Sequence, residues 1–335
     1  MNIQQLRAVC EVVRSGMRVS AAAEALCKAQ PVVSRQIKEL EEELGVQLFH
    51  RSRNRVSGLT PAGRDIHAIA SRILGELSNL AAAAEEHAAP DRGDLTISTT
   101  NTHARYSLPD VIERYSKEFP DVRLSLRQGN PIQAYERLAA GEADIAICTM
   151  PTREAEDIAA LPIYRVAWDV IAAVDHPLTR RKGISLATVA EYPIITHESS
   201  FSGQRIFAEA LSATHASPFI FLEGVDSDVS KAYVKRGLAV AILAKIAYDP
   251  SEDRRLKLLN LDRLFRPSIL TVCFRKQRNL RSYVRSFIRS YAPHLAPQVI
   301  DEALAGEKVD IERMARASPY LERAIPKLGP ASIRK

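Results

Sequence analysis

Hydrophobic residues near the start of the chain recur every three or four positions, which predicts three successive helices. The first covers residues 3–15, and the second is short, rich in alanine and capped by Ser20. The third carries Pro31 in its first turn and ends at Gly45. Its apolar stripe, which we expect to be buried, consists of Val33, Ile37, Leu40 and Leu44. Two short helices joined by a tight turn form a helix-turn-helix.

The other side of the third helix is polar at its beginning, and a run of acidic residues follows only later. In a helix-turn-helix, the N-terminal part of the second helix enters the major groove, where Gln, Arg, Ser and Val side chains can all contact base edges. The alternative is a plain amphipathic helix with a solvated face, but the turn, the proline and the basic segment that follows favour DNA. The residues expected to face DNA are Gln30, Pro31, Val32, Ser34, Arg35 and Lys38.

The segment after the third helix predicts a two-stranded wing, because polar and apolar residues alternate around a Gly-containing turn. Arg51, Arg53 and Arg55 alternate along this segment. We expect them to lie along phosphates and to supply affinity rather than sequence choice. The sequence thus predicts a winged helix-turn-helix DNA-binding domain over residues 1–60.

A long linker helix is predicted over residues 61–89. Thr60 is a strong N-cap, and Pro61 suits the first helical position. Packing on its own chain is the alternative to a partner helix, but the sequence offers no obvious neighbouring segment, so we expect this helix to form a dimer. The apolar residues at helical spacing are Ile66, Ile69, Ile73 and Leu77.

In the second half of the chain, strand-like and helix-like segments alternate, which predicts parallel α/β architecture. We expect two lobes connected near residues 165 and 268. The expected ranges are 90–300 for the whole domain, 90–164 and 268–300 for lobe one, 165–267 for lobe two, and 301–335 for a C-terminal tail without an assigned role.

Hydroxyl-bearing residues follow three of the predicted strands at the point where each strand ends. They lie within residues 99–103, at Thr149 and within residues 199–203. Ligands of open α/β sheets bind beyond the carboxyl ends of strands, and hydroxyls with helix-start amides can hold an anion without a lysine. For any one Thr or Ser, capping of its own helix is the simpler interpretation. Three such groups together favour a shared ligand.

Composition and charge narrow the class of protein. The 335 residues carry a formal net charge of +6, which is compatible with a nucleic-acid partner but is explained equally well by a solvated basic surface. The four cysteines lie far apart without metal-ligand spacing, so we expect buried, reduced thiols. We find no secretory signal and no apolar run long enough to span a bilayer, which predicts a cytoplasmic protein.

The sequence does not favour an enzyme. It contains no Gly-rich phosphate loop, GxSxG elbow, HExxH motif or clustered carboxylate pair. Asp226 and Asp228 are close together, but a capped helix start explains them. We therefore expect no cofactor and no metal. A solute-binding protein for transport is a third alternative, against which the absent signal and the attached helix-turn-helix argue.

The N-terminal pattern resembles that of LysR-type transcriptional regulators. The matching segments are "AAEALCKAQPVVSRQIKELEEELGVQLFHR" and "LTPAGRD". Residues 94–295 resemble the CysB/Cbl branch of that family, which regulates sulfur assimilation, in segments such as "TTNTHARYSLPDVI" and "YPIITHESSFSGQ". The implied fold class is α/β with an N-terminal all-α winged helix-turn-helix and an effector domain of two periplasmic-binding-protein-like lobes.

The resemblance also implies a set of effector-binding residues. Those carried over are Thr100, Thr102, Thr149 and Ser202. His103 stands where the branch commonly has Gln, and Ser202 where it has Thr; His103 could add charge at low pH. Trp168, the only tryptophan, aligns with an aromatic residue near the effector cleft and would otherwise be a core residue.

The function implied is a ligand-responsive regulator of sulfur assimilation or organosulfur (sulfonate) utilisation genes. Its expected partners are double-stranded promoter DNA and a small anionic effector: a sulfate-like anion, thiosulfate, acetylserine or adenosine phosphosulfate. The family resemblance favours a homotetramer over a homodimer, leaves RNA polymerase open as a partner, and implies no membrane. The alternative is a LysR-type regulator of another pathway that senses an aromatic or other carboxylate.

Overall fold

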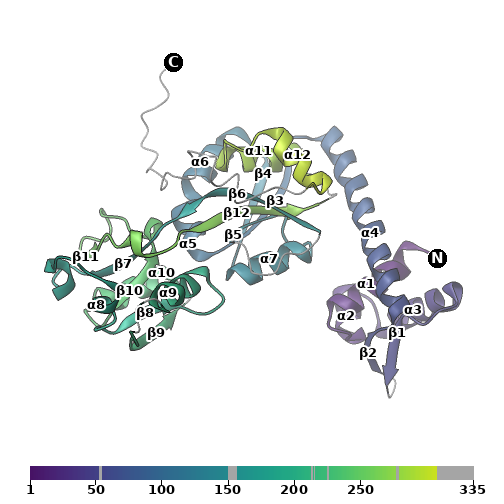
Figure 1. Cartoon of the computed structure of the whole chain (residues 1–335). Helices are drawn as coiled ribbons and strands as arrows, with labels where there is room; N and C mark the ends of the chain where they lie inside the picture. The colour runs from purple at the N-terminus through teal and green to yellow at the C-terminus, as the bar shows by residue number, and fades with distance from the viewer. Residues whose placement is uncertain are drawn as a thin grey trace. The chain divides into compact units, whose positions relative to one another are not determined.

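The chain folds into two compact units (Figure 1). The computed structural model describes residues 1–52, 55–149, 157–212, 214, 216–224, 226–276 and 279–307. The first unit is built on Met1–Ala88, and a short segment ending at Arg281 belongs with it. The second unit contains nearly all other described residues from Ala89 onward. Within the described part of the chain, no helix is both long and apolar enough to cross a bilayer.

The first unit begins with three helices, continues with a short antiparallel hairpin and ends in one long helix. Their bounds are α1 Ile3–Arg14, α2 Val19–Ala25, α3 Gln30–Leu44, β1 Phe49–Ser52, β2 Arg55–Leu59 and α4 Pro61–Ala88. Asn2 caps α1 by accepting a hydrogen bond from the backbone N–H of Gln5, and Gly45 ends α3 at a φ of 69°. The spacing of apolar residues predicted these helices correctly, because each of them buries one continuous face.

Two details of this unit differ from the prediction. Arg18, not Ser20, is the N-cap of α2, because Gly16 and Met17 both have positive φ angles and the helix begins directly after that turn. Leu44, which we expected to be buried, is 38% exposed. The buried stripe of α3 ends one turn earlier, where the chain leaves the core.

Part of α4 packs on its own chain. Ala70 is buried where α1 lies against α4, and Ile66 and Leu74 pack on the same core. The prediction that this helix has no neighbour within the chain was therefore wrong, because α1 is distant in sequence but adjacent in space. The large apolar side chains left exposed on α4 are Ile69, Ile73 and Leu80.

The second unit consists of two lobes, each with a five-stranded sheet. The strand order of lobe one is β4-β3-β5-β12-β6, with β3 Gly93–Thr99, β4 Val122–Gln128, β5 Ile145–Thr149, β6 Ile158–Val166 and β12 Ser268–Arg275. The strand order of lobe two is β11-β7-β10-β8-β9, with β7 Trp168–Ala173, β8 Ile194–His197, β9 Ile220–Gly224, β10 Val240–Ala244 and β11 Leu256–Leu258.

The direction of the strands corrects one expectation. The strands β3, β4 and β5 are parallel, as are β8, β9 and β10, in agreement with the alternation of strands and helices. By contrast, β12 is antiparallel to β5 and β6, and β7 is antiparallel to β10. The sheets are mixed because β6 leads out of lobe one and β12 returns to it, so these two strands run in opposite directions side by side.

Helices cover both faces of the sheet in lobe one. The helix α7 packs on β3, β5 and β12, and α6, α11 and α12 lie on the other side (Figure 1). Lobe one contains α5 Asn101–Tyr106, α6 Pro109–Glu118, α7 Pro131–Ala139, α11 Ser282–Tyr291 and α12 Pro297–Ala305; lobe two contains α8 Leu186–Val189, α9 Ser202–Ser212 and α10 Ser227–Val234. The sequence pattern did not reveal α5, because six residues are too few to show a helical period.

The cysteines are all free, but only two of them are buried. Cys148 and Cys273 lie in the core of lobe one, whereas Cys10 is partly exposed and Cys27 exposed. The expectation of buried thiols is thus confirmed for the strand residues and wrong for Cys27, which lies in the turn between α2 and α3 with a φ of 51°.

Candidate DNA-binding face and effector site

One face of α3 is turned to solvent at its N-terminal end. Ala29 precedes the helix in an extended conformation, and Val33, Ile37 and Leu40 turn inward. On the opposite side, Ser34 is partly exposed. The exposed residues there are Gln30, Pro31, Val32, Arg35 and Lys38. The structure therefore places all six helix residues predicted to face DNA on the accessible side.

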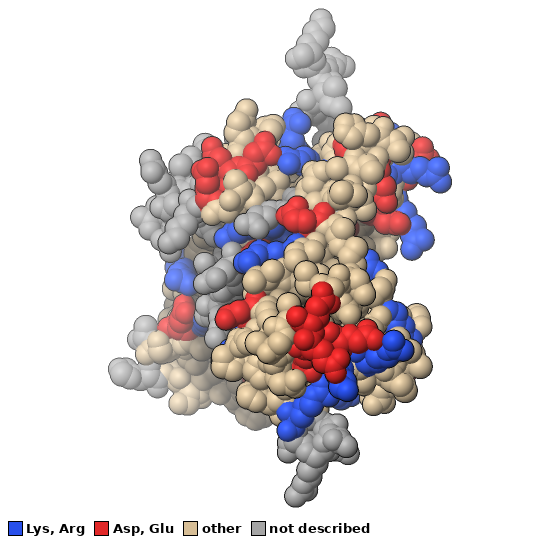
Figure 2. All heavy atoms as spheres, turned by 90° about the vertical axis from the view of Figure 1, so that its right-hand side faces the viewer, with Lys and Arg blue, Asp and Glu red and all other residues tan. Residues whose placement is uncertain are grey.

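The two basic residues on this face are paired with acids one turn further along α3. The Nε of Arg35 lies 2.6 Å from Glu39, and the Nζ of Lys38 lies 3.3 Å from Glu42. Both basic side chains are more than 70% exposed, and such surface pairs contribute no more than about 1 kcal/mol. Arg35 and Lys38 can exchange these partners for DNA at little cost. On the face that Figure 2 shows, acidic and basic side chains lie beside one another and do not form one continuous basic surface.

The sequence reasoning did not identify Glu41 as the residue that fixes the wing. Its buried carboxylate accepts hydrogen bonds from the backbone N–H groups of Leu48, at 2.8 Å, and Phe49, at 3.3 Å. It also accepts one from Arg51, at 2.9 Å. Glu41 therefore ties the start of the wing to α3, and Arg51 is oriented by this pair while its side chain stays 44% exposed.

Arg53 lies outside the described residues, and Arg55 begins β2. The two strands pair antiparallel, with Phe49 opposite Leu59 and a shift of register between His50 and Arg51. The wing that the alternating pattern predicted is therefore present between α3 and α4.

Thr100 and Thr149 lie at neighbouring strand ends in lobe one. Thr100 follows β3 in an extended conformation and precedes α5, yet its hydroxyl makes no capping hydrogen bond. Thr149 is the last residue of β5, which runs parallel to β3. Both side chains are at least nine-tenths buried. Capping of its own helix, the simpler interpretation of Thr100, is therefore not what the structure shows.

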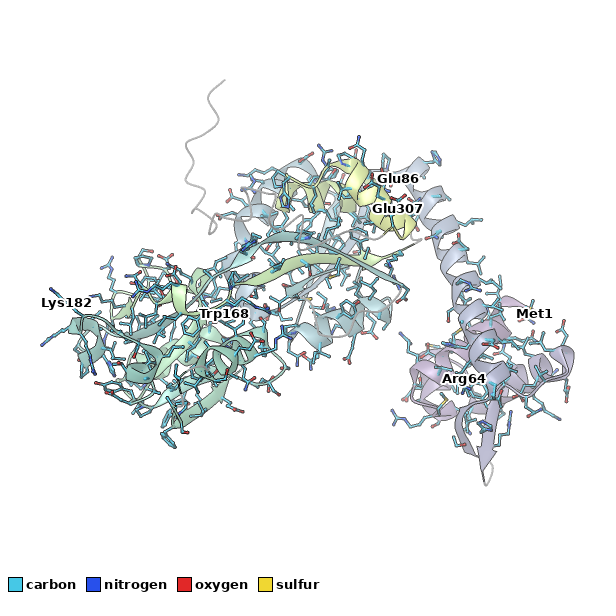
Figure 3. All side chains as sticks on the ribbon, in the orientation of Figure 1. Met1, Arg64, Glu86, Trp168, Lys182 and Glu307 are labelled. Atoms are coloured by element: carbon cyan, nitrogen blue, oxygen red, sulfur yellow. The ribbon has the colours of Figure 1, made fainter. Side chains whose placement is uncertain are left out.

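The strand β12 connects Thr149 to the residues predicted in lobe two. Thr149 pairs with Leu270, and the hydroxyl of Ser268, two residues earlier on β12, accepts a hydrogen bond of 3.1 Å from the indole of Trp168. The ring of Trp168 packs directly on Gly203, where a Cβ atom would lie 2.4 Å from the ring. Ser202 precedes that glycine and opens α9. Figure 3 labels Trp168 at the junction of the two lobes.

His197 is a buried neighbour of this group that we did not predict. It ends β8 and lies edge-on to Trp168, with ring centroids 5.6 Å apart. Burial lowers the pKa of His197 to about 4, although Asp226 acts in the opposite direction. The ring is therefore neutral near pH 7. Nothing in the strand "YPIITHE" distinguishes this histidine from an ordinary core residue.

Thr102 is hydrogen-bonded across the two lobes. Its hydroxyl lies 3.2 Å from that of Ser227, the first residue of α10. The neighbouring Asn101 donates a hydrogen bond of 2.9 Å to Asp226, the N-cap of α10. Ser227 is therefore a further residue beside the predicted site that sequence reasoning missed.

The predicted effector residue His103 is buried. Its ring faces the interior of lobe one, where Nδ1 lies 3.1 Å from the hydroxyl of Tyr164 and 3.5 Å from that of Ser107. Burial lowers the pKa of His103 to about 4. The ring is therefore uncharged near neutral pH, and the hydroxyls of Tyr164 and Ser107 are its partners within lobe one.

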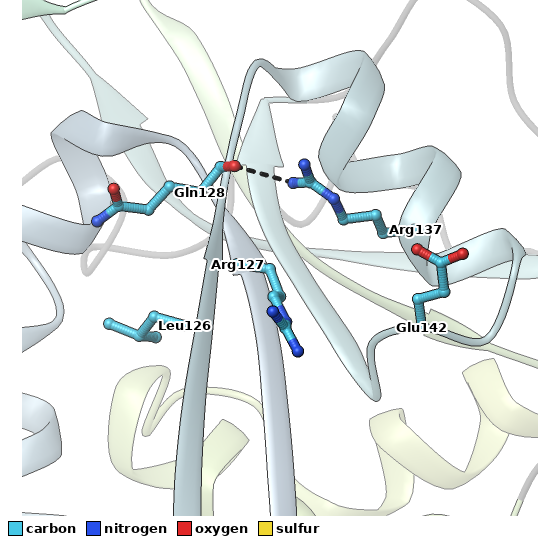
Figure 4. A pocket seen from close by; sticks show the side chains of 5 residues that line it. All are labelled: Leu126, Arg127, Gln128, Arg137 and Glu142. Carbon is cyan, nitrogen blue, oxygen red and sulfur yellow. Dashed lines mark hydrogen bonds between the residues drawn. The ribbon is translucent and has the colours of Figure 1, made fainter.

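Lobe one also has a surface pocket with a different lining. It is lined by Leu126, Arg127, Gln128, Arg137 and Glu142, from the edge strand β4 and from α7 and the loop after it (Figure 4). Arg137 donates a hydrogen bond of 3.0 Å to the backbone carbonyl of Gln128. None of the predicted effector residues lines this pocket.

A winged helix-turn-helix unit joined to a two-lobed α/β domain defines the class of DNA-binding regulators with an effector domain. Residues 3–64 match the bacterial regulatory helix-turn-helix protein model of the lysR family, and residues 88–296 match the LysR substrate binding domain model. The chain belongs to the LysR family of transcriptional regulators. It is accordingly a DNA-binding regulator with an effector-binding domain, and the expectation that it is not an enzyme is confirmed by the family.

Individual relatives align over most of the chain. The HTH-type transcriptional regulator CysB of Burkholderia cenocepacia is 41% identical over 312 residues, which cover 93% of this chain and 100% of that protein. SsuR of the same organism is 41% identical over 283 residues, covering 84% and 92%. The crystal structure of the cofactor-binding domain of the Cbl transcriptional regulator is 32% identical, with a TM-score of 0.61, and covers 64% of this chain and 93% of that one.

Proposed function

We propose that this cytoplasmic protein regulates genes of sulfur assimilation or sulfonate utilisation in response to a small sulfur-containing anion or an acetylserine-type metabolite. The similarity to CysB, SsuR and Cbl supports the choice of pathway. The single observation that carries the site is that the hydroxyl of Thr100, beside the end of β5, makes no capping hydrogen bond to α5. The residues that would bind the effector are Thr100, Thr102, Thr149, Trp168 and Ser202.

Neutral donors suit such a ligand. Hydroxyl groups donate one hydrogen bond each, and α9 directs the backbone N–H groups of its first turn towards its own N-terminal end. His197 contributes no positive charge near pH 7 because burial keeps it neutral. Hydroxyl and backbone N–H dipoles can thus hold a small anion without a charged partner.

We expect Thr100→Val to weaken effector binding roughly tenfold or more. The variant keeps the shape of the side chain but removes one hydroxyl donor, and a hydrogen bond to a charged group contributes about 1.5–3 kcal/mol. Calorimetry with sulfate, thiosulfate, O-acetylserine, N-acetylserine and adenosine phosphosulfate measures the change. Thr188→Val, which removes a hydroxyl from α8, is the matched control and should bind as the wild type does.

Wild-type affinity of Thr100→Val for every ligand in that panel would contradict the proposed site. Binding of an aromatic or other carboxylate, with no binding of the sulfur compounds, would instead assign the protein to another pathway within the same family.

We expect Arg35→Ala to lose specific promoter binding while the second unit stays folded. Arg35 is exposed on the accessible face of α3, and a lost base or phosphate contact costs about 1–3 kcal/mol. Fluorescence anisotropy with a promoter fragment upstream of sulfur genes measures the affinity. Arg181→Ala is the control, because it removes from lobe two an exposed arginine that is also paired with a glutamate. Equal loss in both variants would show that net charge, not the α3 face, determines binding.

LysR regulators oligomerise, and we propose that α4 supplies one contact between chains. Ile69, Ile73 and Leu80 form an exposed apolar face on this helix, which a second α4 could cover. A dimer formed in this way would present two copies of α3 to paired half-sites, and two dimers would form the expected homotetramer.

A further inference from the structure

A row of polar contacts joins α5 of lobe one to the N-cap and the two turns of α10 in lobe two. Consecutive residues at the start of α5 meet consecutive residues at the start of α10, and the row continues to the end of α5. The pairs are Asn101 with Asp226, Thr102 with Ser227, Tyr106 with Asp228, Tyr106 with Lys231, and Arg105 with Asp228. We call this row the α5–α10 contact.

Tyr106 is the centre of the α5–α10 contact. Its hydroxyl donates to the carboxylate of Asp228, at 2.5 Å, and accepts from the ammonium group of Lys231, at 2.8 Å. The ammonium group also lies 4.9 Å from the centre of the Tyr106 ring. Burial raises the pKa of Tyr106 to about 12, so the hydroxyl keeps its proton and can serve both partners.

Lys231 has enough partners within its own lobe to remain buried without Tyr106. Its ammonium group donates to Asp253 and to the backbone carbonyl of Ala247, each at 2.9 Å. Among the residues that the structure describes, its contact from lobe one is Tyr106, through the hydroxyl and the ring. Separation of the lobes would therefore leave the buried charge paired, so the α5–α10 contact can open without the large penalty of an unpaired buried ion.

We propose that the α5–α10 contact holds the two lobes together and thereby determines effector affinity, with Tyr106 as its main positioning residue. This inference rests on the proposed effector site, because Thr102 belongs to both. An effector that needs both lobes binds only the molecules in which they are closed, so its apparent affinity is its intrinsic affinity multiplied by the closed fraction. A weaker contact lowers the closed fraction and therefore the apparent affinity.

The shared hydroxyl of Thr102 is compatible with both roles. A hydroxyl has one donor and two acceptor positions, so Thr102 can accept from Ser227 while it donates to an anion. A bound anion directs the hydroxyl proton of Thr102 towards itself, and the oxygen of Thr102 then accepts the hydrogen bond from Ser227. Effector binding and lobe closure favour each other through this one residue.

Tyr106→Phe tests the proposal because it removes the bridging hydroxyl and keeps the ring beside Lys231. Hydrogen exchange of the ligand-free, full-length chain should be faster in α5 and in the first turn of α10 than in the wild type, and the affinity for sulfate should fall roughly threefold to tenfold. The control is Tyr283→Phe, whose hydroxyl bonds the backbone of Asp94 within lobe one. It should leave exchange at the α5–α10 contact and sulfate affinity unchanged.

The outcomes separate this proposal from the proposed function. Unchanged exchange in ligand-free Tyr106→Phe overturns the α5–α10 contact as the element that holds the lobes, even if Thr100→Val weakens binding. Faster exchange with unchanged sulfate affinity overturns its role in effector binding. Faster exchange together with weaker binding supports the proposal; wild-type affinity of Thr100→Val would then overturn only the assignment of Thr100.

Discussion

Replacing Gly63 with alanine is expected to destabilise the DNA-binding unit by about 3 kcal/mol or more. Gly63 lies in the first turn of α4, and a Cβ atom there would lie 1.9 Å from the backbone carbonyl oxygen of Leu48. Leu48 cannot move away, because it is fully buried and its backbone N–H is bonded to Glu41. The clash is therefore with fixed backbone rather than with a flexible side chain.

Gly75→Ala in the same helix is the matched control. No atom lies within 4 Å of the position of its Cβ, so the variant should gain up to about 1 kcal/mol from helix propensity. Hydrogen exchange of α1 and α3, together with promoter affinity, measures both variants, since the two units can unfold separately. Equal protection of α1 and α3 in Gly63→Ala and in the wild type would show that α4 can shift away from Leu48.

Replacing His103 with glutamine is expected to reduce the loss of stability of the second unit in acid. Burial lowers the pKa of His103 to about 4, whereas an unfolded histidine titrates near 6.5. Below pH 6.5 the unfolded chain takes up a proton that the folded chain does not. The contribution of the neutral His103 to the free energy of unfolding is therefore fully present above pH 6.5 and is lost as the pH falls toward 4. Each pKa unit corresponds to about 1.4 kcal/mol, which gives a loss of about 2 kcal/mol at pH 5.

Glutamine does not titrate and can hydrogen-bond to Tyr164 and Ser107, as the histidine does. Urea unfolding of the second unit should therefore show similar stability for the two proteins at pH 7.5 and a more stable variant at pH 5. His50→Gln changes an exposed wing histidine and should reproduce the acid dependence of the wild type. The assignment fails if His103→Gln loses as much stability between pH 7.5 and pH 5 as the wild type does.

Local patterns were sufficient for most of the helices and strands. The apolar residues of α3 recur at the helical period, Pro31 lies in its first turn, and Gly45 ends it with a left-handed φ angle. Each of these signals acts within a few residues of the backbone, so neighbouring segments are not needed to interpret it. The accessible face of α3 followed directly, because the buried stripe defines the opposite side of the helix. The resemblance of motifs to a known family added the identity of the two domains.

The tertiary structure decided every feature that depends on which distant segments meet. Arg51 was expected only to follow phosphates, yet Glu41 orients it, and this pair exists because the wing returns to α3. The ring of His103 points into lobe one because Tyr164 on the crossover strand β6 lies there. Antiparallel pairing of β6 with β12, and the meeting of Tyr106 with Lys231, arise from a chain that leaves lobe one and comes back. Periodicity specifies which face of an element is buried, but the partner that buries it, and the charge that it brings, come from contacts between residues far apart in sequence.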